Sequence, residues 1–384
     1  MKFSGLIFAN LFRKKARLVL TIGSFAVALF LFAFLAVVKG AFSRGTDIAG
    51  ADRLVIINRI SIIQPLPLSY RDQIAQIPGV KVVTHNNWFG GVYQEEKNFF
   101  PQFAIDPENQ RQVMSELVVP DDQWQTFLKD REGAIVGART AQRFGWKIGD
   151  RVPIKNVAYG NTGTWEFNID GIYHSEKQGG DESQFWFQWD RFEEGVPASY
   201  KGNVGWYVLK LDNPDDAVRI AKTIDTMFAN SSFETKTETE SAFAAGWVKQ
   251  FGNIELLVLT IGSVVFFTLL LVTGNTMAIS VRERVNELGV LKAIGFSDRS
   301  ILFFVLAESL IIALVGGLLG LAFAAFVGIP LAGAALMGLL PPLILSPAIL
   351  SMGLVTALLV GVAGGILPGI GAMRMRVVNA LRRV

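Results

Sequence analysis

Four long apolar runs constrain the fold of this chain more than any other feature. They cover roughly residues 18–38, 254–279, 301–331 and 349–370, and each is close to or above the ~20 apolar residues that span a bilayer as a helix. Only helices and closed barrels cross lipid, and these continuous runs lack the alternation of a barrel strand. We therefore expect an α-helical membrane protein with four transmembrane helices.

The polar residues are concentrated in one insert, residues 39–250, between the first and second runs. Strand candidates at 53–58 and 206–211 each belong to a strand-helix-strand pattern, one at either end of the insert. The fold class is completed by this mixed α/β domain. We expect one subdomain built from both ends and an inner subdomain at about residues 90–200.

Lys and Arg set the orientation. They gather in residues 1–17, 281–300 and 372–384, whereas the loop 332–347 has neither. The positive-inside rule then predicts that both termini and segment 281–300 are cytoplasmic and that the insert is extracytoplasmic. The net charge of +3 thus reflects topology, and no nucleic-acid partner is expected.

The expected order of parts follows from these patterns. The first run is too long for a secretory signal core and has no clear cleavage site, so we read it as an uncleaved anchor. No helix breaker is evident from Ser241 onward, which predicts one continuous helix from the insert into the second span. The parts are an interfacial helix 1–17, spans 18–38, 251–280, 301–331 and 348–371, the domain 39–250, the cytoplasmic helix 281–300, the external loop 332–347 and the tail 372–384.

Enzyme motifs are absent from the sequence. There is no G-x-x-x-x-G-K-[ST] loop for ATP phosphates and no H-E-x-x-H or G-x-S-x-G motif. His85 and His174 are the only histidines, there is no cysteine, and neither histidine has metal-ligand spacing. We therefore predict no catalytic residue, no metal site and no cofactor held by this chain.

Several residues stand out inside the apolar runs. Glu308 is an acidic side chain about two turns into the third run, and intramembrane charges are usually functional. It has no basic partner at helical spacing. Small residues at GxxxG spacing allow close helix approach, either within the chain or between subunits. They are Gly316, Gly317, Gly320, Gly361, Gly365 and Gly369.

Segment 281–300, VRERVNELGVLKAIGFSDRS, interrupts the apolar runs. Apolar and charged residues alternate in it at helical spacing, Gly295 suits a helix C-cap, and Ser297 and Asp298 suit the start of the next helix. The pattern predicts a short amphipathic helix at the membrane surface, which is where a soluble partner would act.

The run RERVNELGVLKAIGFSDRSILFFVLAESLIIALVGGLLGL resembles the core of the MacB/FtsX-like permeases, the type VII or mechanotransmission family of ABC transporters. Their pattern there is close to R-x-R-E-[IL]-G-[IV]-L-[RK]-A-[IL]-G-[AM], and Asn286 departs from it. The ending GGILPGIGAMRMRVVNALRRV and the order of spans and external domain are also similar to the family.

The resemblance implies a dimer of permeases, identical or paralogous, with separate cytoplasmic ATPase subunits that bind ATP and Mg. The helix between spans two and three would dock on the ATPase, and movement would pass to the external domain. A periplasmic adaptor and an outer-membrane channel are further expected partners. The docking role falls on Arg282, Glu283, Glu287, Leu288, Gly289, Lys292 and Gly295.

Three functions remain open at this point. A transporter of this kind either exports a periplasmic peptide or drug or extracts a lipoprotein from the membrane. The same architecture serves as a signalling scaffold that regulates a periplasmic cell-wall hydrolase. An ion-coupled carrier that uses Glu308 is the third reading, and it would need no ATPase.

Overall fold

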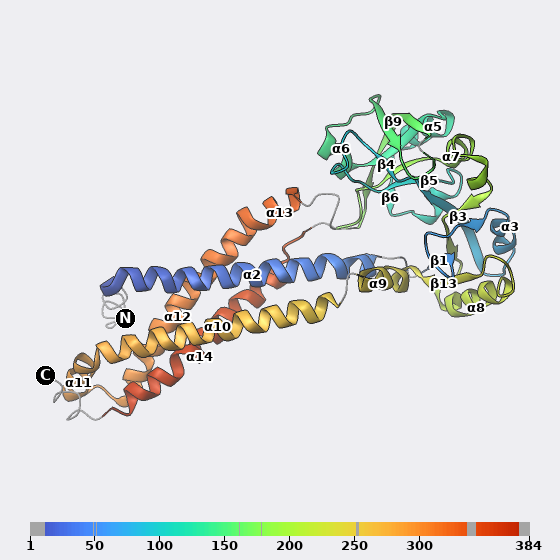
Figure 1. Ribbon diagram of the computed structural model, residues 1–384. Coiled ribbons are helices and arrows are strands. Elements are labelled where there is room, and N and C mark those ends of the chain that lie inside the picture. The colour runs from blue at the N-terminus through green and yellow to red at the C-terminus, as the bar shows by residue number, and fades with distance from the viewer. Residues whose placement is uncertain are drawn as a thin grey trace. The chain divides into compact units, whose positions relative to one another are not determined.

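Two compact units make up the chain in the computed structural model (Figure 1). The described residues of 1–40, 253–335 and 343–384 form the membrane unit, and those of 41–252 form the inserted unit. The residues that the structure describes are 12–48, 50, 52–160, 162–177, 179–250, 253–335 and 343–375.

Long apolar helices build the membrane unit. Among the described residues, four helical stretches are long and apolar enough to cross a bilayer, at Lys15–Phe42, Glu255–Glu283, Asp298–Ala335 and Pro347–Met373. This confirms the predicted four-helix membrane fold. The helices are η1 (Phe12–Lys14), α2 (Lys15–Ile48), α10 (Ile254–Glu283), α11 (Val285–Ala293), α12 (Asp298–Phe323), the π-helical turn η4 (Ala324–Gly328), α13 (Ile329–Ala335) and α14 (Pro347–Met373).

Side-chain caps start three of these helices. Asn253, Ser297 and Ser346 each accept a hydrogen bond from the backbone N–H three residues later, at the start of α10, α12 and α14. Such a cap satisfies one of the N–H groups that a helix start leaves without an internal partner. The expected start of a helix at Ser297 and Asp298 is therefore present.

The expected continuous helix into the second span is wrong. The preceding helix, α9 (Glu240–Gln250), ends before α10 begins. The backbone of Asn253 has φ −81° and ψ 81°, and its side chain bonds the N–H of Leu256. A residue in that conformation cannot continue an α-helix. It is α2 that extends beyond its apolar run, as an unbroken helix from Lys15 to Ile48.

The inserted unit is organised around one mixed sheet. The strand order is β13-β1-β12-β3-β5-β10-β7-β9-β8-β4, with β6 paired to β9. A separate two-stranded sheet pairs β11 with β2. The strands are β1 (Arg53–Asn58), β2 (Leu66–Pro67), β3 (Val80–Trp88), β4 (Gly91–Val92), β5 (Gln102–Ile105), β6 (Leu117–Val118), β7 (Gly133–Gly137), β8 (Arg151–Asn156), β9 (Gly163–Ser175), β10 (Phe185–Gln188), β11 (Asn203–Val204), β12 (Trp206–Leu211) and β13 (Thr235–Thr239).

Strands from the two ends of the insert lie together at one side of this sheet. β1 pairs with β12 and β13, and β12 pairs with β3. The far end of β3 then pairs with β5, which joins this part to the strands of the middle segment. The helices are α3 (Tyr70–Ala75), α4 (Gln110–Val113), α5 (Asp121–Lys129), α6 (Ala138–Phe144), α7 (Trp189–Gly195), η2 (Ala198–Tyr200), η3 (Pro214–Asp216), α8 (Ala217–Met227) and α9.

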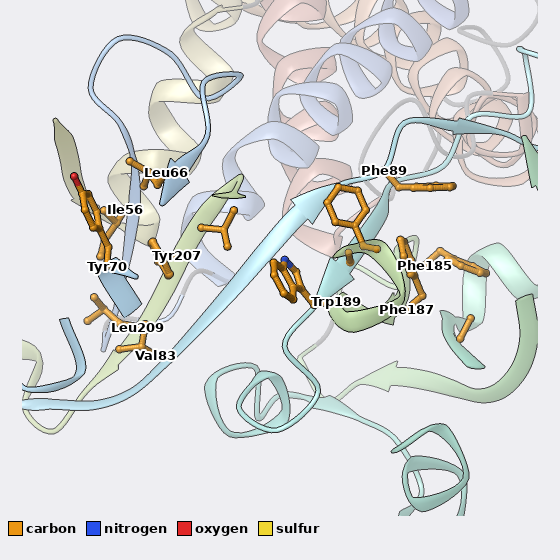
Figure 2. Packing of buried hydrophobic residues seen from close by; sticks show 14 of the residues in the cluster. Ile56, Leu66, Tyr70, Val83, Phe89, Phe185, Phe187, Trp189, Tyr207 and Leu209 are labelled. Atoms are coloured by element: carbon orange, nitrogen blue, oxygen red, sulfur yellow. The ribbon is translucent and has the colours of Figure 1, made fainter. Parts of the chain in front are cut away.

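One continuous cluster of buried hydrophobic residues runs through both halves of the inserted unit (Figure 2). Ile56 and Leu209 are fully buried in the half built from the two ends of the insert. Phe89 and Phe187 are fully buried in the other half, with ring centroids 5.1 Å apart. Each fully buried side chain of this size contributes about 1.5–3 kcal/mol. The inserted unit therefore has its own core. It is an α/β domain inserted after the first membrane helix.

Candidate functional site

The short helix α11 lies between two membrane helices and is separated from both by breaks in the backbone. Arg284, with φ −109° and ψ 16°, ends α10 and precedes α11. After the helix, Gly295 has φ +103°, a conformation that residues with a Cβ rarely adopt. These two positions let α11 lie as a separate element at one end of the membrane unit (Figure 1).

One face of α11 packs inside the membrane unit. Leu288 is 8% exposed and Gly289 is also buried. The Lys292 side chain is 7% exposed, and its Nζ donates to the carbonyl oxygens of Met373 (2.6 Å) and Met375 (2.9 Å). It also pairs with Asp298 at 2.8 Å. Lys292 therefore links α11 to the end of α14 and the start of α12.

The opposite face of α11 is open. Val290 and Ile294 are 49% and 68% exposed, and Asn286 and Ala293 are exposed on the same side. Positions 286, 290, 293 and 294 follow helical spacing and so form one stripe. We call this stripe the exposed α11 face.

Acidic residues of α10 and α11 bind basic residues of η1 and of the start of α2. Glu283 pairs with both Lys14 and Arg17, at 2.6 Å each. Glu287 pairs with Arg13. These exposed pairs add little stability singly, but together they tie the start of α2 to the α10–α11 corner.

Glu308 of α12 forms an ion pair that the sequence did not reveal. Both of its carboxylate oxygens accept hydrogen bonds from Arg284, one at 2.9 Å, and Arg284 also bonds the Ser280 hydroxyl. The two charged side chains are 10% and 14% exposed. A bidentate partner neutralises a carboxylate that would be costly among apolar helices. Glu308 is thus held within the membrane unit at the α10–α11 corner.

The predicted docking residues therefore separate into groups. Leu288, Gly289 and Lys292 pack within the membrane unit. Glu283 and Glu287 are exposed and pair with basic residues of the same unit, and Arg282 and Gly295 are exposed. Sequence reasoning passed over the exposed α11 face. The i, i+4 and i+8 spacing of Asn286, Val290 and Ile294 was the signal that could have found it.

A second buried charge cluster lies in the inserted unit and was also missed. Arg53 is 4% exposed and bonds Glu116 through two nitrogens, at 2.7 and 2.6 Å, and Glu240 through its Nε, at 2.6 Å. Burial alone would raise the pKa of the Glu116 carboxyl, but the Arg53 guanidinium outweighs it and holds that pKa below its usual value. The cluster joins the start of β1, the segment before β6 and the start of α9.

Two family models match the chain. The model of the MacB-like periplasmic core domain matches residues 18–227, more than half of the chain. The model of the FtsX-like permease C-terminal region matches residues 259–377, which include α11 and its neighbouring helices. The chain belongs to the MacB/FtsX-like family of ABC transporter permeases. The resemblance in the 281–300 segment is thereby confirmed.

Relatives of the permease include proteins that are also named ABC transporter permeases. It is 28% identical over 245 residues to the uncharacterised ABC transporter permease YknZ of Bacillus subtilis, covering 62% of this chain and 55% of that one. It is 25% identical over 258 residues to an uncharacterised ABC transporter permease of Methanocaldococcus jannaschii, covering 65% and 62%. The matches thus span little more than half of these relatives. A 108-residue segment is 38% identical to the macrolide export ATP-binding/permease protein MacB of Bdellovibrio bacteriovorus, covering 28% of this chain and 16% of that one.

Solved structures similar to the permease are external domains. The extracellular domain of a YknZ transporter from Gram-positive bacteria aligns with a TM-score of 0.36 and 10% identity, covering 48% of this chain and 99% of that one. The periplasmic region of MacB from Actinobacillus actinomycetemcomitans aligns with a TM-score of 0.37 and 11% identity, covering 53% and 94%.

The predicted packing glycines of the permease lie between its own helices. A Cβ on Gly316 or Gly320 would approach backbone oxygens of α2 within 2.7 and 2.2 Å. A Cβ on Gly317 would meet Ala357 of α14 at 2.9 Å. Gly361, Gly365 and Gly369 of α14 face Ala313, Ser309 and Leu302 of α12 in the same way.

Metal-ligating clusters were not expected in the permease. In the described ranges, no group of three or more His, Cys, Asp or Glu residues is placed to hold a metal ion.

Proposed function

We propose that the permease is driven by separate cytoplasmic ABC ATPase subunits that dock on the exposed α11 face. ATP and Mg would be bound by those subunits. The observation that carries the proposal is the two-sided character of α11. Lys292 and Leu288 hold one side inside the membrane unit, whereas Val290 and Ile294 stay exposed on the other.

Contacts on the buried side would pass movement onward. Lys292 bonds two carbonyl oxygens at the end of α14, and Glu283 and Glu287 pair with η1 and the start of α2. A push on α11 would therefore reach the last and first membrane helices together. Through α2, which is helical up to Ile48, it would reach the extracytoplasmic domain. A second permease, identical or paralogous, would complete the dimer.

The orientation belongs to the same proposal. With α11 in the cytoplasm, both termini lie inside a bacterial inner membrane and the inserted unit lies in the periplasm. The basic residues at the start of α2 and around α11 support this orientation.

Export of a periplasmic peptide or drug is the transport function that we favour over extraction of a lipoprotein. The support is that several relatives are named for macrolide export. A periplasmic adaptor and an outer-membrane channel would be the additional partners. The alternative is a signalling scaffold that regulates a periplasmic cell-wall hydrolase, and co-purification of such a hydrolase without an adaptor would favour it.

The docking claim is tested by placing charges on the exposed α11 face. Tagged full-length permease with Val290→Asp and Ile294→Asp is purified from native membranes in mild detergent, and the accompanying ATPase subunits are quantified by mass spectrometry. A buried apolar contact at the centre of an interface is worth ≥ ~2 kcal/mol, so recovery is expected to fall by at least about tenfold.

The matched control is Val218→Asp. Val218 is 80% exposed on α8 of the inserted unit, and its replacement should leave ATPase recovery unchanged. Full recovery of the ATPase with the α11 double variant would refute docking on this face.

A further inference from the structure

A cavity of about 230 Å³ lies in the membrane unit beside the α10–α11 corner. The start of α2, the last turns of α10, Arg284 and α12 line it. A single water needs only about 10–15 Å³ of such space, so there is room for a phosphate group with part of a headgroup. We call it the corner cavity.

The entrance of the corner cavity carries more positive than negative charge. Lys14 and Arg17 share the single carboxylate of Glu283, one on each of its oxygens. One carboxylate balances only one of these two cations. Among the described residues, the Lys14 ammonium and the Arg17 guanidinium make no other side-chain hydrogen bond, so both retain N–H donors.

The remaining charged groups of the cavity are already balanced. Arg284 and Glu308 form a bidentate pair, and Arg13 pairs with Glu287. Leu18, Met277 and Ile312 add apolar walls. The cavity thus combines an unbalanced cation with apolar surface. It lies where the span Lys15–Phe42 begins and the span Glu255–Glu283 ends.

We propose that the corner cavity binds the phosphate of an anionic phospholipid from the bordering leaflet. Lys14 and Arg17 would donate to the phosphate oxygens, and the apolar wall would contact the glycerol backbone and first methylenes. Basic pockets between membrane helices bind anionic headgroups by this combination. A phospholipid, unlike free phosphate, uses both parts of the cavity. Val290 and Ile294 of the exposed α11 face do not line this site.

The test is native mass spectrometry of the full-length protein, titrated separately with phosphatidylglycerol and phosphatidylcholine. The wild type is expected to prefer the first phosphatidylglycerol. In Arg17→Gln or Lys14→Gln this preference should fall about fivefold, the effect expected of one basic residue at a membrane surface. Lys15→Gln is the matched control, because Lys15 is exposed on the same helix and does not line the cavity.

A fourth variant separates binding from a structural role. Glu283→Gln removes the carboxylate that competes with the phosphate, so phosphatidylglycerol should bind more tightly. If the ion pairs of Glu283 with Lys14 and Arg17 serve only to hold the helices together, their loss in Glu283→Gln should weaken lipid binding instead. The proposal is overturned by that weaker binding, by equal lipid preference in Arg17→Gln, Lys15→Gln and wild type, or by equimolar inorganic phosphate displacing the lipid.

Discussion

Arg53 shows at the scale of a single residue how the inserted unit is tied together. Its guanidinium is 4% exposed and pairs with both Glu116 and Glu240, which belong to different segments. A buried ion pair is not a strong source of net stability, but removing one partner leaves the other charges uncompensated. The residue therefore fixes where the chain enters and leaves the domain.

Arg53→Met should lower the free energy of unfolding of the inserted unit by about 3 kcal/mol, because two carboxylates lose their buried partner. All tryptophans of the chain lie within residues 41–252, so intrinsic fluorescence during urea unfolding reports this unit. Arg59→Met is the control. Arg59 forms an exposed pair with Glu234 and should cost less than about 1 kcal/mol. Equal effects of the two variants would contradict the assignment.

His85 is a buried titratable residue at the junction of β3, β12 and β5. Burial is the main cause that lowers its pKa to about 4, Asp106 at 3.7 Å opposes the shift, and Arg71 adds to it. The unfolded chain binds a proton near pH 6.5 and the folded chain does not. Stability from this residue is therefore complete above pH 6.5 and is lost as the pH falls toward 4.

In His85→Gln the loss of stability between pH 6.5 and 4.5 should be smaller than in wild type, by on the order of 2 kcal/mol. Fluorescence-monitored urea unfolding at each pH measures it. His174→Gln is the control, since His174 is exposed and is the only other histidine. Asp170, whose pKa burial raises to about 6, acts in the opposite direction but is common to all variants. Parallel pH profiles for wild type and His85→Gln would contradict this account.

At the scale of elements, close packing of α2, α12 and α14 depends on glycine. A Cβ on Gly320 would lie 2.2 Å from the carbonyl oxygen of Ala26, so the two helices would have to separate. Gly320→Ala should lower the thermal midpoint of the helical circular dichroism signal by about 5 °C or more. Gly262→Ala on α10 meets nothing within 4 Å and should leave the midpoint unchanged or slightly higher. A similar midpoint in both variants would mean that the helices do not pack as described.

The contact between α11 and α14 gives a second test at this scale. Lys292→Met keeps the side-chain length but removes the donors to the carbonyl oxygens of Met373 and Met375. The last turn of α14 should then fray. Hydrogen exchange at Arg374 and Met375 should be at least about tenfold faster, an opening cost lower by ~1.4 kcal/mol. Arg299→Met, exposed at the start of α12, is the control. Unchanged exchange in Lys292→Met would rule out the link.

Sequence patterns predicted the secondary-structure elements better than the side-chain contacts between them. The four spans followed from the apolar runs because lipid imposes the same requirement on every segment that crosses it. The partners of Arg284 and Arg53 could not be predicted, because Glu308 is 24 residues away along the chain and Glu116 is 63 away. The helix break at Asn253 was missed because Asn is tolerated inside helices, and only its conformation makes it a cap.

At the scale of the whole molecule, we propose that α11 is the input of a transporter whose output is the inserted domain. The proposed input surface is small and defined by Val290 and Ile294. The proposed route runs through Lys292 to α14 and through Glu283 and Glu287 to α2. This route requires the ATPase to bind the exposed α11 face.

Site-specific photo-crosslinking tests that dependence most directly. The natural chain has no cysteine, so Ile294→Cys can carry a single thiol-attached photo-crosslinker in native membranes. The account predicts a crosslink from position 294 to an ABC ATPase subunit, and none from an equally labelled Val218→Cys on the inserted unit. A labelled Ile294→Cys permease that crosslinks to lipid alone, or an ATPase crosslink from position 218, would contradict it.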